Sequence, residues 1–181
     1  MTENLTWIDL EMSGLDPDRH VILEIATIVT NGELDIVAEG PNVVIHHPQE
    51  ALATIDDWSK TQHDASGLLA KVRLSSYDTA AAEATTLDFL RQYVREGESP
   101  LCGNSIWQDR RFLSRYMPAL NAFFHYRNID VSTVKELANR WYPSLPKPKK
   151  RKDHLALGDI KESIGELRYY REKVFRSTWK A

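Results

Sequence analysis

Two carboxylates interrupt an apolar run near the start of the chain. In "WIDLEMSGLDP", residues 7–17, Asp9 and Glu11 are separated by one residue and flanked by large apolar side chains. This alternation predicts a β-strand with both acids on one face, about 6.5 to 7 Å apart along the chain. Two carboxylates so placed can share a divalent cation, and pairs of such ions about 4 Å apart serve phosphoryl chemistry. The alternative is an edge strand whose acidic face is solvated.

Two further acids and a histidine add to this pattern. Asp109 follows the turn "CGNS" and precedes Phe112 and Leu113 by three and four residues, which places it on the inward stripe of a predicted helix. Asp159 lies in the first turn of the last predicted helix, and His154 precedes it in a basic loop. A neutral imidazole can take a proton from an attacking water. Each residue alone also has an ordinary interpretation, as a helix N-terminal acid or a solvated histidine.

Hydrophobic patterning predicts the elements that carry these residues. We expect strands over 5–12, 21–30, 33–47 with a break near Gly40-Pro41, 99–105 and 126–132. We expect short helices within 49–72 and longer ones over 78–96, 106–117, 133–142 and 157–175. Asp78 is a predicted N-cap, Gly97 a predicted end, and Pro118 a predicted helix stop. The order predicts one α/β domain over residues 1–181, with a mixed five-stranded sheet flanked by helices.

Composition narrows the classes of ligand and compartment. The 181 residues suit one domain, and the formal net charge of −3 lacks the basic excess of proteins that track long nucleic acids. The ligand is therefore either not a nucleic acid or a short one held by a few contacts. The lone Cys102, expected to be a buried structural residue, excludes an intrachain disulfide and fits a reducing compartment. With no apolar run long enough to span a membrane and no leader, we expect a cytoplasmic protein.

The ordered set of motifs resembles a known family. D-x-E in the first strand, an Asp after "GNS", and H-x4-D opening the last helix are similar to the DEDDh family of 3′-to-5′ exonucleases. Longer stretches such as "DDWS", "FHYRNIDVSTVKELA" and "HLALGDIKESIGELRYYRE" extend this resemblance over about residues 5–172, toward members that act on very short RNA. The resemblance implies a ribonuclease H-like fold, a homodimer, and 3′-to-5′ removal of nucleotides from short RNA, down to dinucleotides.

The same resemblance implies the residues of the reaction centre. Four acids match the family's ligands for two divalent ions, Mg²⁺ or Mn²⁺: Asp9, Glu11, Asp109 and Asp159. His154 matches the general base. Near these residues the sequence departs from the family pattern at two places. The segment "KPKKRKD" is unusually basic, and its role over 147–152 is open; Gly158 stands where the family often has a second acid.

The resemblance further implies a set of substrate contacts. Leu15 matches a residue that wedges against a base, and Trp58 and His63 match substrate-contacting positions. The remaining positions belong to the 5′ side and its terminal phosphate, with Tyr126 and Arg127 supplied by the neighbouring subunit: Ser105, Gln108, Tyr126, Arg127, Ser132 and Thr133. Ordinary interpretations stay open for several of them. Leu15 could serve packing, Trp58 the core, "HYR" a strand edge, and Ser132 a helix N-cap.

Two other functions compete with this one. A general 3′ exonuclease of the same chemistry would act on longer RNA or DNA ends, and would be expected to carry a basic track. A regulatory module with a dead site would bind nucleotides without hydrolysis. All five motif residues are present, which argues against the dead site.

Overall fold

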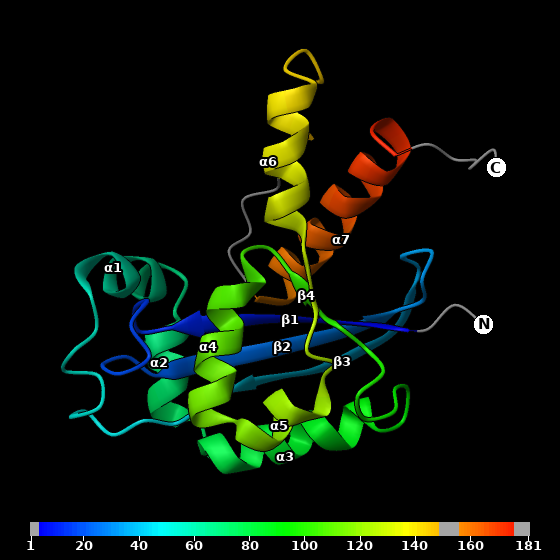
Figure 1. The fold of residues 1–181 in the computed structure, drawn as a ribbon. Helices are drawn as coiled ribbons and strands as arrows, with labels where there is room; N and C mark the ends of the chain where they lie inside the picture. Colours follow the sequence, from blue (N-terminus) through cyan, green and yellow to red (C-terminus); the bar gives the residue numbers. More distant parts are fainter. Residues whose placement is uncertain (1–3, 149–155, 176–181) are drawn as a thin grey trace.

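The computed structural model describes residues 4–148 and 156–175 and contains five strands and seven helices in these ranges (Figure 1). The strands are β1 (Leu5–Met12), β2 (Ile22–Thr30), β3 (Ile36–Val44), β4 (Leu101–Gly103) and β5 (Asn128–Asp130). The helices are α1 (Asp57–Ala65), α2 (Leu68–Leu74), α3 (Thr79–Leu90), α4 (Ile106–Tyr116), α5 (Pro118–Phe123), α6 (Val131–Trp141) and α7 (Ala156–Lys173). The predicted α/β organisation is confirmed.

The five strands form one mixed sheet with β1 at its centre, in the order β3-β2-β1-β4-β5. Strand β1 is antiparallel to β2 and parallel to β4. Its two faces are both covered, because Trp7 packs in one core cluster and Ile8 and Leu10 in another. The edge-strand interpretation of Asp9 and Glu11 is therefore wrong, and these half-buried acids lie on the central strand of the sheet.

Helices flank the sheet on two sides (Figure 1). The cluster around Ile8 and Leu10 includes residues of α3, α4 and α5, among them Phe112. The cluster around Trp7 includes Val131 of α6 and Ile160 of α7. Alternation along β1 therefore directs successive side chains into two helix layers, and the helices that carry Asp109 and Asp159 approach the same strand from opposite faces.

Several predicted boundaries differ from the structure. Strand β3 is continuous through Gly40-Pro41, and its ladder with β2 accommodates two register shifts instead of a break. Helix α3 ends at Leu90, not Glu96, because Tyr93 N–H bonds to Leu90 O in a tighter turn. This turn brings Val94 onto the core. Pro118 ends α4 as predicted but also opens α5, where its missing N–H costs nothing.

The segment predicted as a strand over 126–132 is mostly not one. Strand β5 covers only Asn128–Asp130, and helix α6 begins at Val131. The Asp130 carboxylate accepts from Ser132 N–H at 2.9 Å and caps the helix. The N-cap role considered for Ser132 is therefore wrong, whereas Asp78 does cap α3 through Ala81 N–H at 2.7 Å.

Two further expectations concern Cys102 and the membrane. Cys102 is buried in β4, and burial raises the pKa of its thiol, which confirms a structural residue. Within the described ranges, no helix combines the length and apolarity that a membrane crossing requires.

Replacing Phe112 tests how much the core beneath β1 contributes to the free energy of unfolding. Its side chain is fully buried in the cluster with Ile8 and Leu10. We predict that Phe112→Ala lowers the free energy of unfolding by about 3–5 kcal/mol, because the cavity cannot collapse completely. Ser114→Ala, on the exposed side of the same helix, should change it by less than about 0.5 kcal/mol. Urea unfolding followed by circular dichroism measures both, and similar values would contradict this assignment of the core.

Candidate active site

Three carboxylates converge at one end of β1. Asp9 and Glu11 of the strand and Asp159 of α7 each offer an oxygen within 4.8 Å of the others, an arrangement that could hold a metal ion. Asp109 of α4 is buried, and its Oδ1 accepts from Leu10 N–H at 3.0 Å. The bond anchors Asp109 to the strand between Asp9 and Glu11. The structure therefore brings together all four acids that the sequence predicts as ligands.

The electrostatics of this cluster favour a bound cation. Burial, followed by the carboxylates of Asp109, Glu11 and Asp159, raises the pKa of Asp9 well above its usual range. Burial and the charge of Asp159 raise the pKa of Glu11 to about 7, and burial raises the pKa of Asp109 to about 7. Carboxylates that retain protons near neutrality because they are buried close together bind divalent cations in exchange for those protons. The cluster therefore fits divalent metal ions.

Glu24 is a fifth acid at the cluster that the motifs do not predict. It lies on β2 directly across the ladder from Glu11 and is buried. Its charge contributes to the raised pKa values of Asp9 and Glu11. A lone acid within the apolar strand "VILEIATIVT" was the available signal, because an unpaired carboxylate there requires a partner.

His63 supports the acid cluster from α1. Its Nε2 lies 2.9 Å from Met12 O, which can only accept, so Nε2 carries a proton. Its Nδ1 lies 3.9 Å from Glu11 Oε2. On the same helix Trp58 is 72% exposed, so its interpretation as a core residue is wrong. Helix α1 thus places one imidazole against Glu11 and one indole at the surface.

The loop after β1 presents Leu15 to solvent. Leu15 is 66% exposed, so the packing interpretation is wrong. Gln108 of α4 is buried and donates from Nε2 to Leu15 O at 2.5 Å, while Arg111 donates to Gln108 Oε1 at 2.9 Å. A side chain at Gly14 would place its Cβ 2.5 Å from the imidazole of His20, so the loop requires glycine there. Gln108 therefore supports the loop that carries Leu15.

Polar groups gather where β4, β5 and α6 meet. Ser105, with a φ of 50°, lies on the turn before α4 and donates its N–H to Asp130 Oδ1 and to Ser132 Oγ, both at 2.9 Å. The Ser105 and Ser132 hydroxyl oxygens are 3.2 Å apart. Thr133 is exposed beside them on α6. Three of the residues expected at a terminal phosphate thus lie together.

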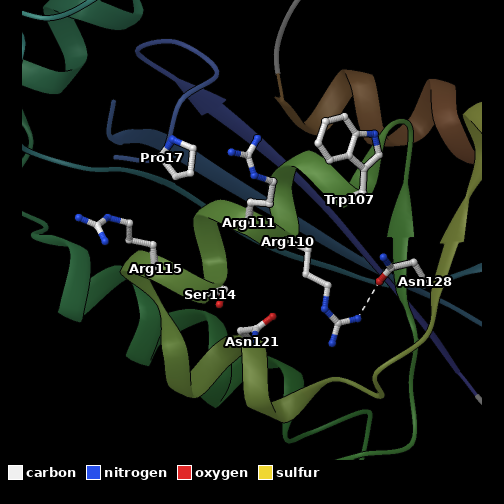
Figure 2. A pocket seen from close by; sticks show the side chains of 8 residues that line it. All are labelled: Pro17, Trp107, Arg110, Arg111, Ser114, Arg115, Asn121 and Asn128. Atoms are coloured by element: carbon white, nitrogen blue, oxygen red, sulfur yellow. Dashed lines mark hydrogen bonds between the residues drawn. The ribbon is translucent and has the colours of Figure 1, made fainter. Parts of the chain in front are cut away.

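Tyr126 and Arg127 lie on the connection before β5 and not on its edge, so the strand-edge interpretation is wrong. Tyr126 is 75% exposed, and the Arg127 guanidinium lies 5.4 Å from its ring centre. Arg110 Nη1 donates to the Asn128 side chain at 2.7 Å (Figure 2). It also donates to Tyr126 O at 3.2 Å. The connection is thereby fixed with its tyrosine directed outward. His154 and positions 149–152 of the basic loop lie outside the described residues.

Comparison with known proteins identifies the family. A family model described as "Exonuclease" matches residues 6–167. The oligoribonuclease of Aeromonas hydrophila subsp. hydrophila is 58% identical over 175 residues, which cover 96% of this chain and 97% of that protein. The oligoribonuclease of Coxiella burnetii is 60% identical over 170 residues, 93% of each chain. The chain belongs to the oligoribonuclease family. This membership confirms the expected 3′-to-5′ exoribonuclease, a hydrolase of phosphodiester bonds.

Solved structures confirm the fold of this oligoribonuclease-family chain. Exonuclease I of E. coli in complex with a dT13 oligonucleotide aligns with a TM-score of 0.73 at 14% identity. The alignment covers 93% of this chain but only 41% of that structure, so the present chain spans about two fifths of its length. The exonuclease fold predicted from the motifs is therefore confirmed. Family membership and the acid cluster together indicate a hydrolase that depends on divalent metal.

The raised pKa values predict how pH affects the metal-free protein. The pKa of Glu11 rises from 4.5 to about 7 on folding, so the folded state binds more protons than the unfolded state between these values. Its contribution to stability is complete below pH 4.5 and is lost as the pH rises through about 7. Asp109, raised from 3.8 to about 7, acts in the same direction.

We therefore expect the free energy of unfolding in chelator to decrease between pH 5 and 8, and Mg²⁺ to reduce that decrease. Urea titrations at both pH values measure the effect. Glu11→Gln should weaken the pH dependence, whereas Glu136→Gln, at an exposed ion pair on α6, should preserve it. Equal stability of chelated wild type at both pH values would contradict the electrostatics described for the cluster.

Proposed function

We propose that the protein hydrolyses very short RNA, down to dinucleotides, from the 3′ end, with two divalent ions and His154 as general base. The observation that carries this proposal is the convergence of Asp9, Glu11 and Asp159, with Asp109 anchored to the same strand. These four acids would hold the ions, Mg²⁺ or Mn²⁺, because both prefer carboxylate oxygens.

The protein contributes fixed positions and a proton acceptor. When bound, the ions lower the pKa of the attacking water and stabilise charge on the phosphate and the leaving 3′ oxygen. Asp9 and Glu11 are fixed by the β1–β2 ladder, and Asp109 is oriented by its bond from Leu10 N–H. His154 accepts the proton of the attacking water in its neutral form. Carboxylates on regular elements need little rearrangement when the substrate enters.

Short RNA is the substrate class that the surface favours. The net charge of −3 offers little general attraction for a long phosphate backbone. Exposed Leu15 and Trp58 would contact bases, and the buried imidazole of His63 would contact the substrate deeper in the site. The terminal phosphate would bind among the polar side chains beside α6, namely Ser105, Ser132 and Thr133, together with an Arg127 supplied by the neighbouring subunit. Gln108 would act on the 5′ side by supporting the Leu15 loop.

We also propose a homodimer in which Tyr126 and Arg127 complete the partner's site. The support is that Tyr126 is exposed and its segment is held outward by Arg110. The adjoining face of α4 carries exposed Trp107 at a hollow of about 720 Å³ (Figure 2). Exposed aromatic side chains are enriched at protein interfaces. We further propose that residues 1–181 form one exonuclease domain, and the lone buried Cys102 supports a cytoplasmic location.

A general exonuclease on longer RNA or DNA ends is the second candidate. One observation favours it: the hollow on α4 is lined by three arginines, Arg110, Arg111 and Arg115, which could contact a longer backbone. Arg110 is engaged with backbone carbonyls and Arg115 pairs with Asp18 at 3.4 Å, so part of this charge is already compensated. The complete acid cluster argues against a catalytically dead module.

A length series separates the two enzymatic candidates. We expect that, among 5′-labelled RNAs of two to ten nucleotides, the dinucleotide is cleaved fastest in the presence of Mn²⁺. In chelator, no RNA of the series should be cleaved. Asp9→Ala should leave less than about one per cent of the activity, because a two-metal centre supplies several kcal/mol. The control Asp64→Ala removes an exposed acid of α1 and should retain activity. Faster cleavage of the longer RNAs would favour the general exonuclease.

His154→Ala should lower turnover more than substrate affinity. A general base contributes about 10²- to 10⁴-fold, and this contribution should shrink at high pH, where hydroxide is more abundant. Steady-state kinetics on a dinucleotide from pH 6 to 10 give kcat and KM separately. His46→Ala, at an exposed histidine after β3, is the matched control. Normal turnover of His154→Ala at neutral pH would remove this histidine from the mechanism.

Subunit mixing tests Tyr126. Tyr126→Ala and Asp9→Ala homodimers should each be nearly inactive. In a mixed dimer, the Asp9→Ala chain lends its tyrosine to the partner with intact acids, so one of two sites is complete. With equal chains and free exchange about half the dimers are mixed, and activity should recover to about a quarter of wild type. Background activity despite exchange, verified by an affinity tag, would place Tyr126 outside the partner's site.

A further inference from the structure

A polar network lies behind the hydroxyls of Ser105 and Ser132. Asn104, the residue before Ser105, donates from Nδ2 to Ser163 Oγ at 2.8 Å and to Glu166 Oε2 at 3.3 Å. Ser163 and Glu166 belong to α7 and are both buried. Ser132 Oγ in turn donates to Asn104 Oδ1 at 3.1 Å. One amide therefore connects the catalytic helix α7 with the first turn of α6.

The buried carboxylate fixes the direction of the hydrogen bonds that Asn104 makes with its neighbours. The Glu166 carboxylate pairs with Lys135 Nζ at 3.2 Å and can only accept, so the amide nitrogen of Asn104 must face it. The amide oxygen then faces Ser132 and can only accept, so the Ser132 proton is committed to Asn104. Ser132 Oγ consequently acts as an acceptor toward Ser105, whose backbone N–H it binds at 2.9 Å.

These assignments leave Ser105 as the group whose proton can be redirected. Its hydroxyl oxygen, 3.2 Å from Ser132 Oγ, receives no proton from that serine, so its own O–H donates inward or to a ligand. Ser105 is exposed, whereas Ser132 is half-buried. The backbone donors are already engaged, because Asp130 Oδ1 accepts from both Ser105 N–H and Ser132 N–H. These two N–H groups are therefore not free to bind an oxyanion, whereas the Ser105 hydroxyl is.

We propose that Asn104 and Glu166 are positioning residues that, through Ser132, orient the Ser105 hydroxyl toward the 5′-terminal phosphate of a short RNA. The inference rests on the proposed phosphate contact and deepens it. Glu166 fixes the amide, the amide takes the Ser132 proton, and Ser132 leaves the Ser105 hydroxyl as a donor to the phosphate. Neither positioning residue needs to touch the substrate itself.

The test compares one dinucleotide with and without its 5′ phosphate, using full-length protein with Mn²⁺. Asn104→Ala and the isosteric Glu166→Gln should each lower the ratio of the two kcat/KM values about tenfold, the effect of losing one hydrogen bond to a charged group. The loss should appear mainly in KM of the phosphorylated substrate. Glu136→Gln, at an exposed ion pair of α6, is the control and should leave the ratio unchanged.

Each outcome separates the inference from the function on which it rests. A wild-type ratio of one would overturn the phosphate contact and, with it, the network. A wild-type preference that both variants keep would overturn only the network. An equal loss on both substrates, with a lowered urea midpoint, would show a purely structural role and would also overturn it. If Asn104→Ala does not fold, Glu166→Gln alone decides the result.

Discussion

The burial of several carboxylates close together is the constraint on which the rest of this structure depends. Asp9, Glu11, Asp109 and Asp159 come from three elements, and buried Glu24 adds a fifth negative group opposite Glu11. Without cations such a cluster favours separation of its elements or uptake of protons. The central position of β1, packed on both faces, opposes that separation. The hydrophobic layers thus hold in place a charge arrangement that is unfavourable until metal binds.

The shared face of Asp9 and Glu11 could be predicted from the sequence, whereas the position of their strand in the sheet could not. Alternation along residues 5–12 was sufficient to place Asp9 and Glu11 on one face, because side chains of a strand alternate strictly. The same pattern could not distinguish a central from an edge strand, since that depends on pairing with the distant β4. Glu24 escaped prediction for a similar reason, because its proximity to Glu11 depends on the register of the β1–β2 ladder.

Boundaries and caps were the weakest part of the prediction. The end of α3 depends on a tight turn that brings Val94 onto the core, which local propensity cannot reveal. Asp130 and Ser132 both have good N-cap side chains, and only the backbone conformation before α6 selects Asp130. The substrate contacts lay on loops and helix surfaces, where neither hydrophobic period applies. For these positions the family motifs carried the prediction, and the structure then showed Leu15, Trp58 and Tyr126 to be exposed.

The neighbouring residues Gln108 and Asp109 have a consequence for how this protein can evolve. One side chain supports the loop of Leu15, while the next is anchored to Leu10 N–H at the acids. Successive residues of a helix differ in direction by about 100°. Inserting or deleting one residue before this pair would rotate both side chains away from their partners together. The turn between β4 and α4 is therefore expected to keep a fixed length in functional descendants, although loops elsewhere tolerate such changes.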